Sequence, residues 1–462
     1  MELLYLILAL TLPWLLGSIW LRLFIPSGPL SLILGGGLLL GLLAVPILMR
    51  LVDAAGLPIT FAYVGSITGI LVAGGFAANR ARDIAATGSA PSSLGPGVLT
   101  IWQKAFFTLL VALVSLRLLT LGLEVIWRPL FPWDATMHWA TKSKVWFYSH
   151  SISAFVDNDL WLEMGGAGVF TDHHPGYPIT IPLLQVWINS ALGRWDESLM
   201  NLPWVLCFMA LGLMFYGQAR AAGTGALVAI VFTYFLLSMP LLNTHVALAG
   251  YADLFLGTCY AGAIMAFHNW SLKREPWQGA LALIFAFSCL LIKNEGFFWL
   301  LTFIPALVVV ALPFRSAAFF LLAGLVTTFA LLWLIPGDFS LAGHSLDRLN
   351  LHYRAEALPA VVRGFTIHAS WHLFAYLLMC LIPLGYVMAG KSRRQYLGIG
   401  AALSGAIGLF LILFLFTDYA SGAVRFTAVG RIALQLVPSL MFLIMLLYHE
   451  ASRDPDQQCL PQ

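Results

Sequence analysis

The chain has 462 residues, of which 60% are hydrophobic and only 10% are charged, and its formal net charge is +3. A soluble domain is about half apolar and about a quarter charged, so this composition excludes an ordinary soluble domain and predicts an integral membrane protein. The few positive charges are spread over loop ends, which indicates membrane topology rather than a nucleic-acid partner.

Apolar runs of about 20 residues recur along the chain, and each is long enough to cross roughly 30 Å of hydrocarbon. In lipid the backbone must bond to itself, so these runs are predicted to be helices and the fold class to be all-α. The first run has neither a basic leading region nor a clear small-residue cleavage site, so it is predicted to be a retained helix. About 13 transmembrane helices are predicted, at residues 3–21, 29–49, 58–78, 103–123, 199–217, 223–242, 250–268, 277–292, 296–313, 316–335, 371–390, 396–416 and 431–448.

The Lys and Arg residues of the short loops predict which side of the membrane each loop occupies. These loops alternate consistently only if residues 123–198 contain no complete crossing, so the apolar segment 177–191 is predicted to lie along the membrane surface. The basic loops are then cytoplasmic, the N-terminus is outside and the C-terminus is inside. The basic set is Arg22, Arg80, Arg82, Lys104, Arg220, Lys273, Arg274, Arg315, Lys391, Arg393, Arg394 and Arg453.

Polar segments between the helices define the expected domain organisation. Residues 123–198 are rich in Trp, Tyr, His and Asp, which is typical of amphipathic helices at the headgroup level. Residues 83–99 are rich in Gly, Ser and Pro and are predicted to form a flexible cytoplasmic linker. This linker divides the chain into three N-terminal helices at residues 1–99 and a larger module at residues 100–462. The expected outer segments are residues 123–198, 337–370 and 417–430.

The strongest polar cluster is in the sequence FPWDATMHWATKSKVWFY, which follows an outward-going helix. Helical spacing places Asp134 and His138 on one face, and either Thr141 or Lys142 follows on the same face. A carboxylate beside lysines at a membrane surface can act as a general base while the cations hold an anionic substrate. The alternative is an interfacial helix in which Lys142 and Lys144 simply extend to the lipid headgroups.

A second polar cluster is in the sequence FTDHHPGYPITIPLLQVW. Asp172, His173 and His174 are candidate ligands of a divalent metal or a phosphate. Adjacent side chains converge on one ion only if the backbone turns, and Pro175 and Gly176 could supply that turn. The alternative is a turn that leads into a surface helix.

Charged residues also occur at the outer ends of predicted helices. Asp253 in AGYADLFLG opens a helix, where the helix dipole favours a carboxylate. Lys293 and Glu295 in LLIKNEGFFW lie between two apolar runs, where ionisable groups usually face an interior cavity, although a purely structural ion pair is an alternative. Arg425 lies in the last expected outer segment, and Arg431 follows this segment and begins a helix. The dipole disfavours a cation there, so Arg431 is expected to have an anionic partner or ligand.

Together these segments resemble the GT-C superfamily of membrane glycosyltransferases, over residues 103–448. The nearest resemblance is to the family that contains protein O-mannosyltransferases and the lipid A aminoarabinose transferase. In this resemblance Asp134 in PWDATMHW matches the catalytic acidic residue, and HHPGYPITIPLLQVW matches the Pro-rich segment near the donor phosphate, around His174 to Tyr177. GYADLFLG resembles a short acidic motif, LIKNEGFFW a Lys-Gly motif, and VGRIALQLVPSLMFL the start of the final helix, with Arg431.

The chain departs from the family pattern in two places. Three additional helices precede the helix that is normally the first of the fold. The Lys-Pro-Pro signature is replaced by His173, His174 and Pro175. The cation that this signature supplies would then come from Lys142, Lys144 or Lys293.

The resemblance implies a GT-C-like fold with amphipathic juxtamembrane helices. It also implies transfer of a sugar from a polyprenyl-phosphate donor to an extracytoplasmic acceptor, whether lipid, polysaccharide or protein, at a bacterial inner membrane. Asp134 would take the acceptor's proton, and the departing phosphate would need cations or a divalent metal as cofactor, with Asp172, His173 and His174 as candidate ligands. The candidate donor-phosphate residues are Lys293, Arg431, His173, His174, Lys142 and Lys144. The candidate substrate-binding residues are Tyr177, Asp253, Glu295, Arg425 and His138.

Other functional classes remain as alternatives. A transporter or flippase of an anionic lipid or solute would need charges near the bilayer midplane and usually has broken helices or internal repeats. Here the charges are predicted on one face and no inverted repeat is evident, which favours the enzyme. A polymerase or ligase of lipid-linked glycans would share the outer face and the polyprenyl substrate.

Overall fold

The computed structural model describes residues 1–25, 28–85, 99–337, 339–341, 344–345, 350–388 and 393–452. Residues 86–98 of the expected linker 83–99 lie outside these ranges, as does part of the expected outer segment 337–370, and residues 83–85 are helical. Lys391 and Arg453 of the basic set also lie outside the described residues.

The fold is all-α, as the sequence predicts, and the strands in the described ranges are two pairs of two residues each. The elements of the first half are α1 (Glu2–Phe24), α2 (Leu30–Ala54), α3 (Phe61–Ala85), α4 (Ile101–Trp127), η1 (Ala135–Ala140), α5 (Thr141–Ser149), β1 (Phe155–Val156), α6 (Asn158–Glu163), β2 (Phe170–Thr171), α7 (Thr180–Leu192), η2 (Leu199–Asn201), α8 (Leu202–Ala221), α9 (Ala226–Leu237) and α10 (Pro240–Ala247). Those of the second half are α11 (Asp253–Lys273), α12 (Pro276–Ser288), η3 (Cys289–Leu291), α13 (Gly296–Leu301), α14 (Phe303–Ala311), α15 (Phe314–Leu334), β3 (Ser340–Leu341), β4 (His344–Ser345), α17 (Ala357–Arg363), η4 (Gly364–His368), α18 (Phe374–Met388), α19 (Arg393–Phe416), α20 (Ala420–Val424) and α21 (Val429–Ala451). β1 pairs with β2 in parallel, and β3 pairs with β4 in antiparallel orientation.

Eight of the described helices are long and apolar enough to cross a membrane, which agrees with the prediction of an integral membrane protein. They are α1, α2, α3, α4, the continuous helix η2–α8, α15, α19 and α21. α9 and α10 would make a ninth span if counted together, but the two are bent by 60°. Three further apolar helices are shorter, at Pro276–Leu291, Gly296–Ala311 and Phe374–Gly385. Helix α11 is not among the eight. The predicted number of 13 spans is therefore not confirmed.

The three N-terminal helices pack against the rest of the chain. α2 lies so close to α8 that a methyl group on Gly217 would come within 2.5 Å of the backbone nitrogen of Leu32. α1 meets α7, where the indole of Trp187 donates a hydrogen bond of 2.8 Å to the carbonyl of Ala9. Leu39 of α2 also belongs to the same hydrophobic core as Phe208 of α8.

Helix α7 lies inside the protein rather than on a free surface. All of its residues except Ser190 are buried. Its polar side chains are satisfied internally, since Gln185 donates to Asn201 and the Asn189 side chain accepts from the backbone of Asp196. α1, α2 and α5 cover this helix, so its apolar side chains contact the protein, while its predicted position along the membrane surface stays a prediction.

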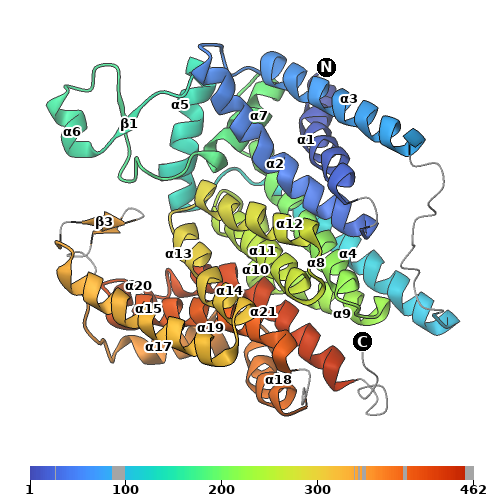
Figure 1. The fold of residues 1–462 in the computed structure, drawn as a ribbon. Helices are drawn as coiled ribbons and strands as arrows, with labels where there is room; N and C mark the ends of the chain where they lie inside the picture. The colour runs from blue at the N-terminus through green and yellow to red at the C-terminus, as the bar shows by residue number, and fades with distance from the viewer. Residues whose placement is uncertain are drawn as a thin grey trace.

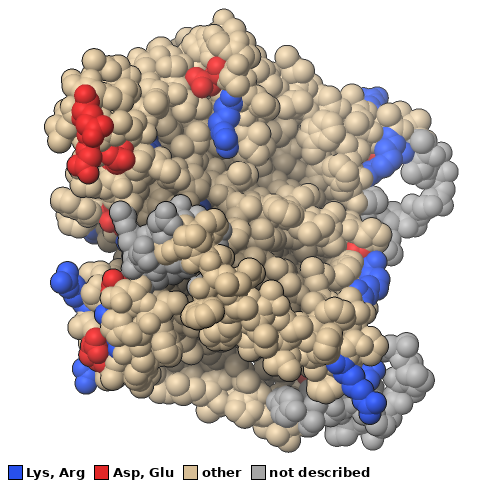
Figure 2. Space-filling model, turned by 60° about the vertical axis from the view of Figure 1, so that its left-hand side comes forward, with Lys and Arg blue, Asp and Glu red and all other residues tan. Residues whose placement is uncertain are grey.

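The expected outer segments lie together at one end of the molecule. Figure 1 shows α5, α6, β3 and α20 on its left side, while the C-terminal end of α21 and the start of α4 lie on the right. Figure 2 shows most of the Lys, Arg, Asp and Glu side chains of that face near its left and right margins, with a broad uncharged surface between them. This separation is what a protein with an apolar band around its middle presents.

Candidate functional site

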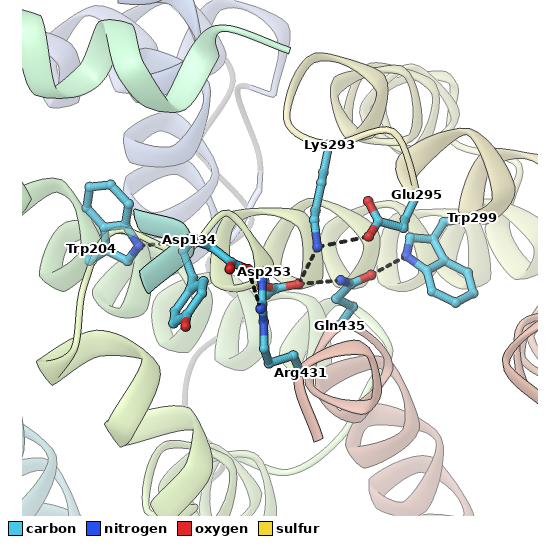
Figure 3. A network of polar contacts seen from close by, with 9 residues as sticks. Asp134, Trp204, Asp253, Lys293, Glu295, Trp299, Arg431 and Gln435 are labelled. Carbon is cyan, nitrogen blue, oxygen red and sulfur yellow. Dashed lines mark hydrogen bonds and ion pairs between the residues drawn. The ribbon is translucent and has the colours of Figure 1, made fainter. Parts of the chain in front are cut away.

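Five charged side chains from four distant segments meet at the end of the helices where the expected outer segments lie (Figure 3). They form what we call the Asp253 network, which comprises Asp134 before η1, Asp253 at the start of α11, Lys293 and Glu295 between η3 and α13, and Arg431 in the first turn of α21. The pair Asp134–Arg431 joins residues 297 positions apart in the sequence. Only tertiary folding can bring these groups together.

Two glycines allow the chain to make this arrangement. Gly250 precedes α11 and has a φ of +111°, and a methyl group there would lie 2.5 Å from Cβ of Ala135. The turn before Asp253 therefore packs directly against the residue that follows Asp134. Gly296 closes the turn after Lys293, where a methyl group would lie 2.1 Å from the carbonyl oxygen of Cys289. A larger residue at either position would push the charged side chains apart.

Asp253 is the centre of the network and is fully buried. Its Oδ2 accepts hydrogen bonds of 3.2 Å from both Nε and Nη2 of Arg431. Its Oδ1 accepts a hydrogen bond of 3.1 Å from Nζ of Lys293 and one of 2.6 Å from Nε2 of Gln435. A buried carboxylate is tolerated only when it is paired and its lone pairs are filled, and Asp253 meets this condition. It therefore holds both cations in place.

Arg431 has the anionic partners that its place at a helix N-terminus predicts. Arg431 contacts Asp134 as well as Asp253, and its Nη1 lies 2.5 Å from Oδ2 of Asp134. The guanidinium carbon lies 4.1 Å from the centre of the Tyr251 ring, which is the geometry of a cation–π contact. The carbonyl of Tyr251 is in turn fixed by the indole of Trp204, at 2.8 Å. These contacts offset the unfavourable helix dipole at this position.

Lys293 joins Asp253 to Glu295. Its Nζ lies 2.9 Å from Oε1 of Glu295, so the predicted possibility of a Lys293–Glu295 pair is realised, but within a larger network. Oε2 of Glu295 is buried and has no hydrogen-bond partner among the described residues. The indole of Trp299 donates a hydrogen bond of 2.6 Å to Oε1 of Gln435. This bond orients the amide that contacts Asp253.

Exposure differs strongly among the members of the network, and Glu295 is 20% exposed. The Asp253 side chain is 0% exposed and Lys293 is 8% exposed, whereas Arg431 is 24% and Asp134 is 34% exposed. Asp134 is thus the carboxylate that an incoming molecule reaches first. Arg431 uses three of its five N–H groups for Asp253 and Asp134, which leaves two for another acceptor.

A second cluster lies in the expected outer segment 123–198, and we call its members Asp172, His138 and Lys142 the outer-loop cluster. Asp172 Oδ1 lies 2.6 Å from Nδ1 of His138, and Oδ2 lies 2.7 Å from Nζ of Lys142. Lys142 also donates a hydrogen bond of 2.8 Å to the carbonyl of His174. Burial alone would raise the pKa of Asp172, but the hydrogen bonds from His138 and Lys142 and the charge of Lys142 lower this pKa to about 2. Burial of Lys142 lowers its own pKa, although Asp172 acts in the opposite direction.

The side chains predicted on one helical face thus divide between two clusters. Residues 135–140 form a π-helical turn, from which His138 and the following Lys142 contact Asp172. Asp134 instead contacts Arg431. The reason is that the two partners lie on different elements, which the spacing of the sequence does not reveal.

An aromatic stack lies beside the outer-loop cluster. Tyr177 lies between His174, at 4.7 Å between ring centres, and Trp139, at 5.2 Å. Burial raises the pKa of the Tyr177 phenol, and the negative charge of Glu295 raises it further. Tyr177 is therefore neutral, and it packs against His174 beside the outer-loop cluster.

The three candidate metal ligands Asp172, His173 and His174 do not converge. Both oxygens of Asp172 face His138 and Lys142, His173 contacts Asn158 at 3.3 Å, and the His174 ring lies on Tyr177. Within the described ranges, no group of three or more His, Cys, Asp or Glu side chains is placed to hold a metal ion.

Two other candidates lie apart from both clusters. Lys144 is exposed and its ammonium lies 5.7 Å from the Trp195 ring. Arg425 is exposed, and its side chain has no polar partner in the part of the chain that the structure describes. Conversely, Gln435 and Tyr251 contact the network although neither was predicted from the sequence. The spacing of four residues between Arg431 and Gln435 on an otherwise apolar helix was the available signal.

The chemistry of this arrangement follows from its charges. A half-buried carboxylate can accept a proton, and the adjacent guanidinium can hold an anion through its remaining N–H groups. The deeper groups, Asp253 and Lys293, keep these two side chains in position. Comparison with protein-family models, with curated proteins and with solved structures finds no match for this chain.

Proposed function

We propose that the protein is an integral membrane glycosyltransferase that moves a sugar from a polyprenyl-phosphate donor to an extracytoplasmic acceptor. The resemblance of its segments to the GT-C superfamily suggests this activity. The observation that carries the proposal is the 2.5 Å pair between Asp134 and Arg431, at the open side of the Asp253 network. Two segments of the resemblance, far apart in the chain, thereby supply a base and an anion-binding cation at one point.

In the proposed reaction Asp134 takes a proton from the acceptor hydroxyl. The acceptor oxygen forms a bond with the anomeric carbon while the bond from that carbon to the phosphate oxygen breaks. The electron pair of the broken bond leaves with the phosphate, whose added charge Arg431 and Lys293 stabilise. A single displacement of this kind inverts the anomeric configuration.

Donor binding and activation of the base are coupled in this scheme. In the structure the network has three carboxylates and two cations, so it is net negative and each cation already contacts carboxylates. A phosphate that binds to the two remaining N–H groups of Arg431 shares the guanidinium charge with Asp134 and weakens the Asp134–Arg431 pair. Its arrival therefore releases Asp134 to accept a proton only when the donor is present.

The outer-loop cluster would shape the substrate site. Lys142 is 1% exposed and already paired, so its role in the proposal is to position the segment that carries His174 rather than to bind phosphate. His138 is oriented by Asp172 through Nδ1, which leaves Nε2 for a substrate oxygen. His173 and His174 are exposed and available to the donor phosphate or the acceptor.

An apolar groove beside the network suits the lipid part of the donor. It has a volume of about 130 Å³ and reaches from Glu295 and Tyr419 to Trp299, Phe410 and Leu413. This volume takes only the first part of an isoprenoid chain, next to the phosphate at the network. The proposal includes about 13 membrane crossings, with the network facing the periplasm of a bacterium because the basic loops lie at the opposite end.

A transporter of an anionic lipid or solute is the second candidate. The 60° bend between α9 and α10, close to Asp253 in the chain, is a feature of proteins that change conformation during transport. Against it, the network lies at the first residues of α11 and α21 rather than at their middles. A ligase of lipid-linked glycans would use the same face of the protein. It is distinguished from the proposed glycosyltransferase only by the product that it forms.

The proposal is tested by mass spectrometry of envelope glycans and lipids from cells with the native protein, without it, or with Asp134→Asn. The matched control is Asp159→Asn, because Asp159 is an exposed carboxylate of the same outer segment. Loss of one glycosylated species in the deletion and in Asp134→Asn, with accumulation of its polyprenyl-linked donor, supports the enzyme. A deletion defect that Asp134→Asn does not reproduce, at equal protein abundance, contradicts the role of Asp134 and favours transport.

A further inference from the structure

A second large groove lies at the opposite end of the helices from the Asp253 network. It has a volume of about 870 Å³ and is bounded by α11, α14, α15, α18, α19 and α21. Its walls are mostly apolar and include Val310, Phe314, Leu321, Leu443 and Leu447. The volume is at the upper end of the range of about 300–1,000 Å³ that holds small ligands.

One end of this groove is basic. Arg274, just after α11, and Arg394, in the first turn of α19, both line it. Arg274 is held over the Trp270 ring at 4.8 Å and uses one N–H for the carbonyl of Val310. Arg394 is exposed and has no side-chain partner in the described ranges. No Asp or Glu lines the groove among these residues, so both guanidinium groups keep free donors.

The length of the groove matches one leaflet of a bilayer. Along α19 it reaches from Arg394 to Ser404, which at 1.5 Å per residue is about 15 Å. The hydrocarbon core of a membrane is about 30 Å thick, so this is about half of it. A basic entrance with an apolar channel behind it fits a molecule that has a phosphate at one end and hydrocarbon chains at the other.

We propose that this groove binds an anionic phospholipid, with its phosphate between Arg274 and Arg394 and its acyl chains along α15 and α19. Basic pockets between transmembrane helices recognise anionic headgroups in this way. The site is separate from the Asp253 network, because α11 begins at Asp253 and ends next to Arg274, about 30 Å further along the helix. It is also independent of the proposed glycosyl transfer.

The competing explanation is that these arginines only mark the cytoplasmic side of the membrane. Arg315 provides a matched control. It is an exposed arginine in the first turn of α15, next to Phe314 of the groove, but it does not line the groove itself. A specific lipid site requires Arg274 and Arg394, whereas a general charge preference would depend equally on Arg315.

The test uses the full-length protein in nanodiscs of phosphatidylcholine with a minor fraction of phosphatidylglycerol. Native mass spectrometry after extraction measures how many molecules of each lipid remain bound. We expect retention of phosphatidylglycerol by the native protein. Each arginine near a membrane surface contributes about a fivefold preference for anionic lipid, so the double variant Arg274→Gln/Arg394→Gln is expected to lose about 30-fold in affinity. Arg315→Gln is expected to retain the lipid.

Further variants separate folding effects from lipid binding. Arg274→Lys/Arg394→Lys keeps the charges and is expected to restore most of the preference, with an unchanged melting temperature in phosphatidylcholine alone. Equal retention of the two lipids by the native protein would overturn the proposal, as would an equal loss in Arg315→Gln. If inorganic phosphate displaces the lipid or stabilises the protein to the same extent, the site binds free phosphate and the lipid assignment is wrong.

Discussion

Asp134 and Arg431 form a 2.5 Å ion pair although 297 residues separate them in the chain. The pair is the exposed edge of a network whose centre, Asp253, is fully buried. Because the two residues come from opposite ends of the larger module, their contact requires that α4, α11 and α21 are already assembled. The network is therefore both a candidate site and a tertiary connection between these helices.

Asp253→Ala is expected to destabilise the protein strongly. The change leaves Lys293 and Arg431 without their shared buried partner, and loss of one member of a buried ion pair costs about 3–5 kcal/mol. Thermal unfolding in detergent measures this effect. Asp159→Asn, at an exposed carboxylate, should leave the melting temperature unchanged. A native melting temperature in Asp253→Ala would show that the network contributes little to stability.

Arg431→Lys should impair the proposed reaction while the protein still folds. Lysine keeps the charge but cannot contact Asp253 through two nitrogens and Asp134 through a third. Hydrogen bonds to charged groups contribute about 1.5–3 kcal/mol each, which corresponds to about a 10- to 100-fold lower rate of product formation. The measurement is conversion of donor in membranes at matched protein abundance. Activity equal to the native protein would exclude a specific role for the guanidinium.

The outer-loop cluster should make stability depend on pH in the acid range. The pKa of Asp172 is about 2 in the folded protein, against an ordinary value of 3.8. Since the folded pKa is the lower one, the ionised form stabilises the fold by about 2 kcal/mol above pH 4. This stabilisation is lost as the pH falls from about 4 to about 2. Unfolding of the native protein and of Asp172→Asn at several pH values measures it, and the variant should show a flatter dependence. An identical pH dependence would mean that Asp172 is not paired in solution.

Gly217→Ala should loosen the N-terminal helices from the rest of the chain. The added methyl group would lie 2.5 Å from the backbone nitrogen of Leu32, and overpacking of this kind costs about 1–3 kcal/mol. Gly74→Ala is the control, because a methyl group there has nothing within 4 Å. Limited proteolysis in detergent should cleave Gly217→Ala more rapidly than the control. Equal cleavage would indicate that the close contact between α2 and α8 is easily relaxed.

The sequence predicted several parts of the site from local rules. A carboxylate at the start of one helix and an arginine at the start of another can be recognised in the sequence alone. The anionic partner that was expected for Arg431 is present. Lys293 and Glu295 are close in the sequence, so their pairing could be anticipated. Gln435 and Tyr251 were not recognised, because their importance depends on residues far from them in the chain.

The sequence by itself determined that this protein is an all-α membrane protein with its polar segments gathered at one end. The physical reason is that the length and apolarity of each run decide whether it can cross lipid as a helix. Only the tertiary structure decided that α7 is interior and that Asp172 pairs with His138 and Lys142. It also decided that Asp134, Asp253 and Arg431 form one network. These outcomes depend on which helices pack together, and a buried charge takes its partner from whichever segment that packing brings within reach.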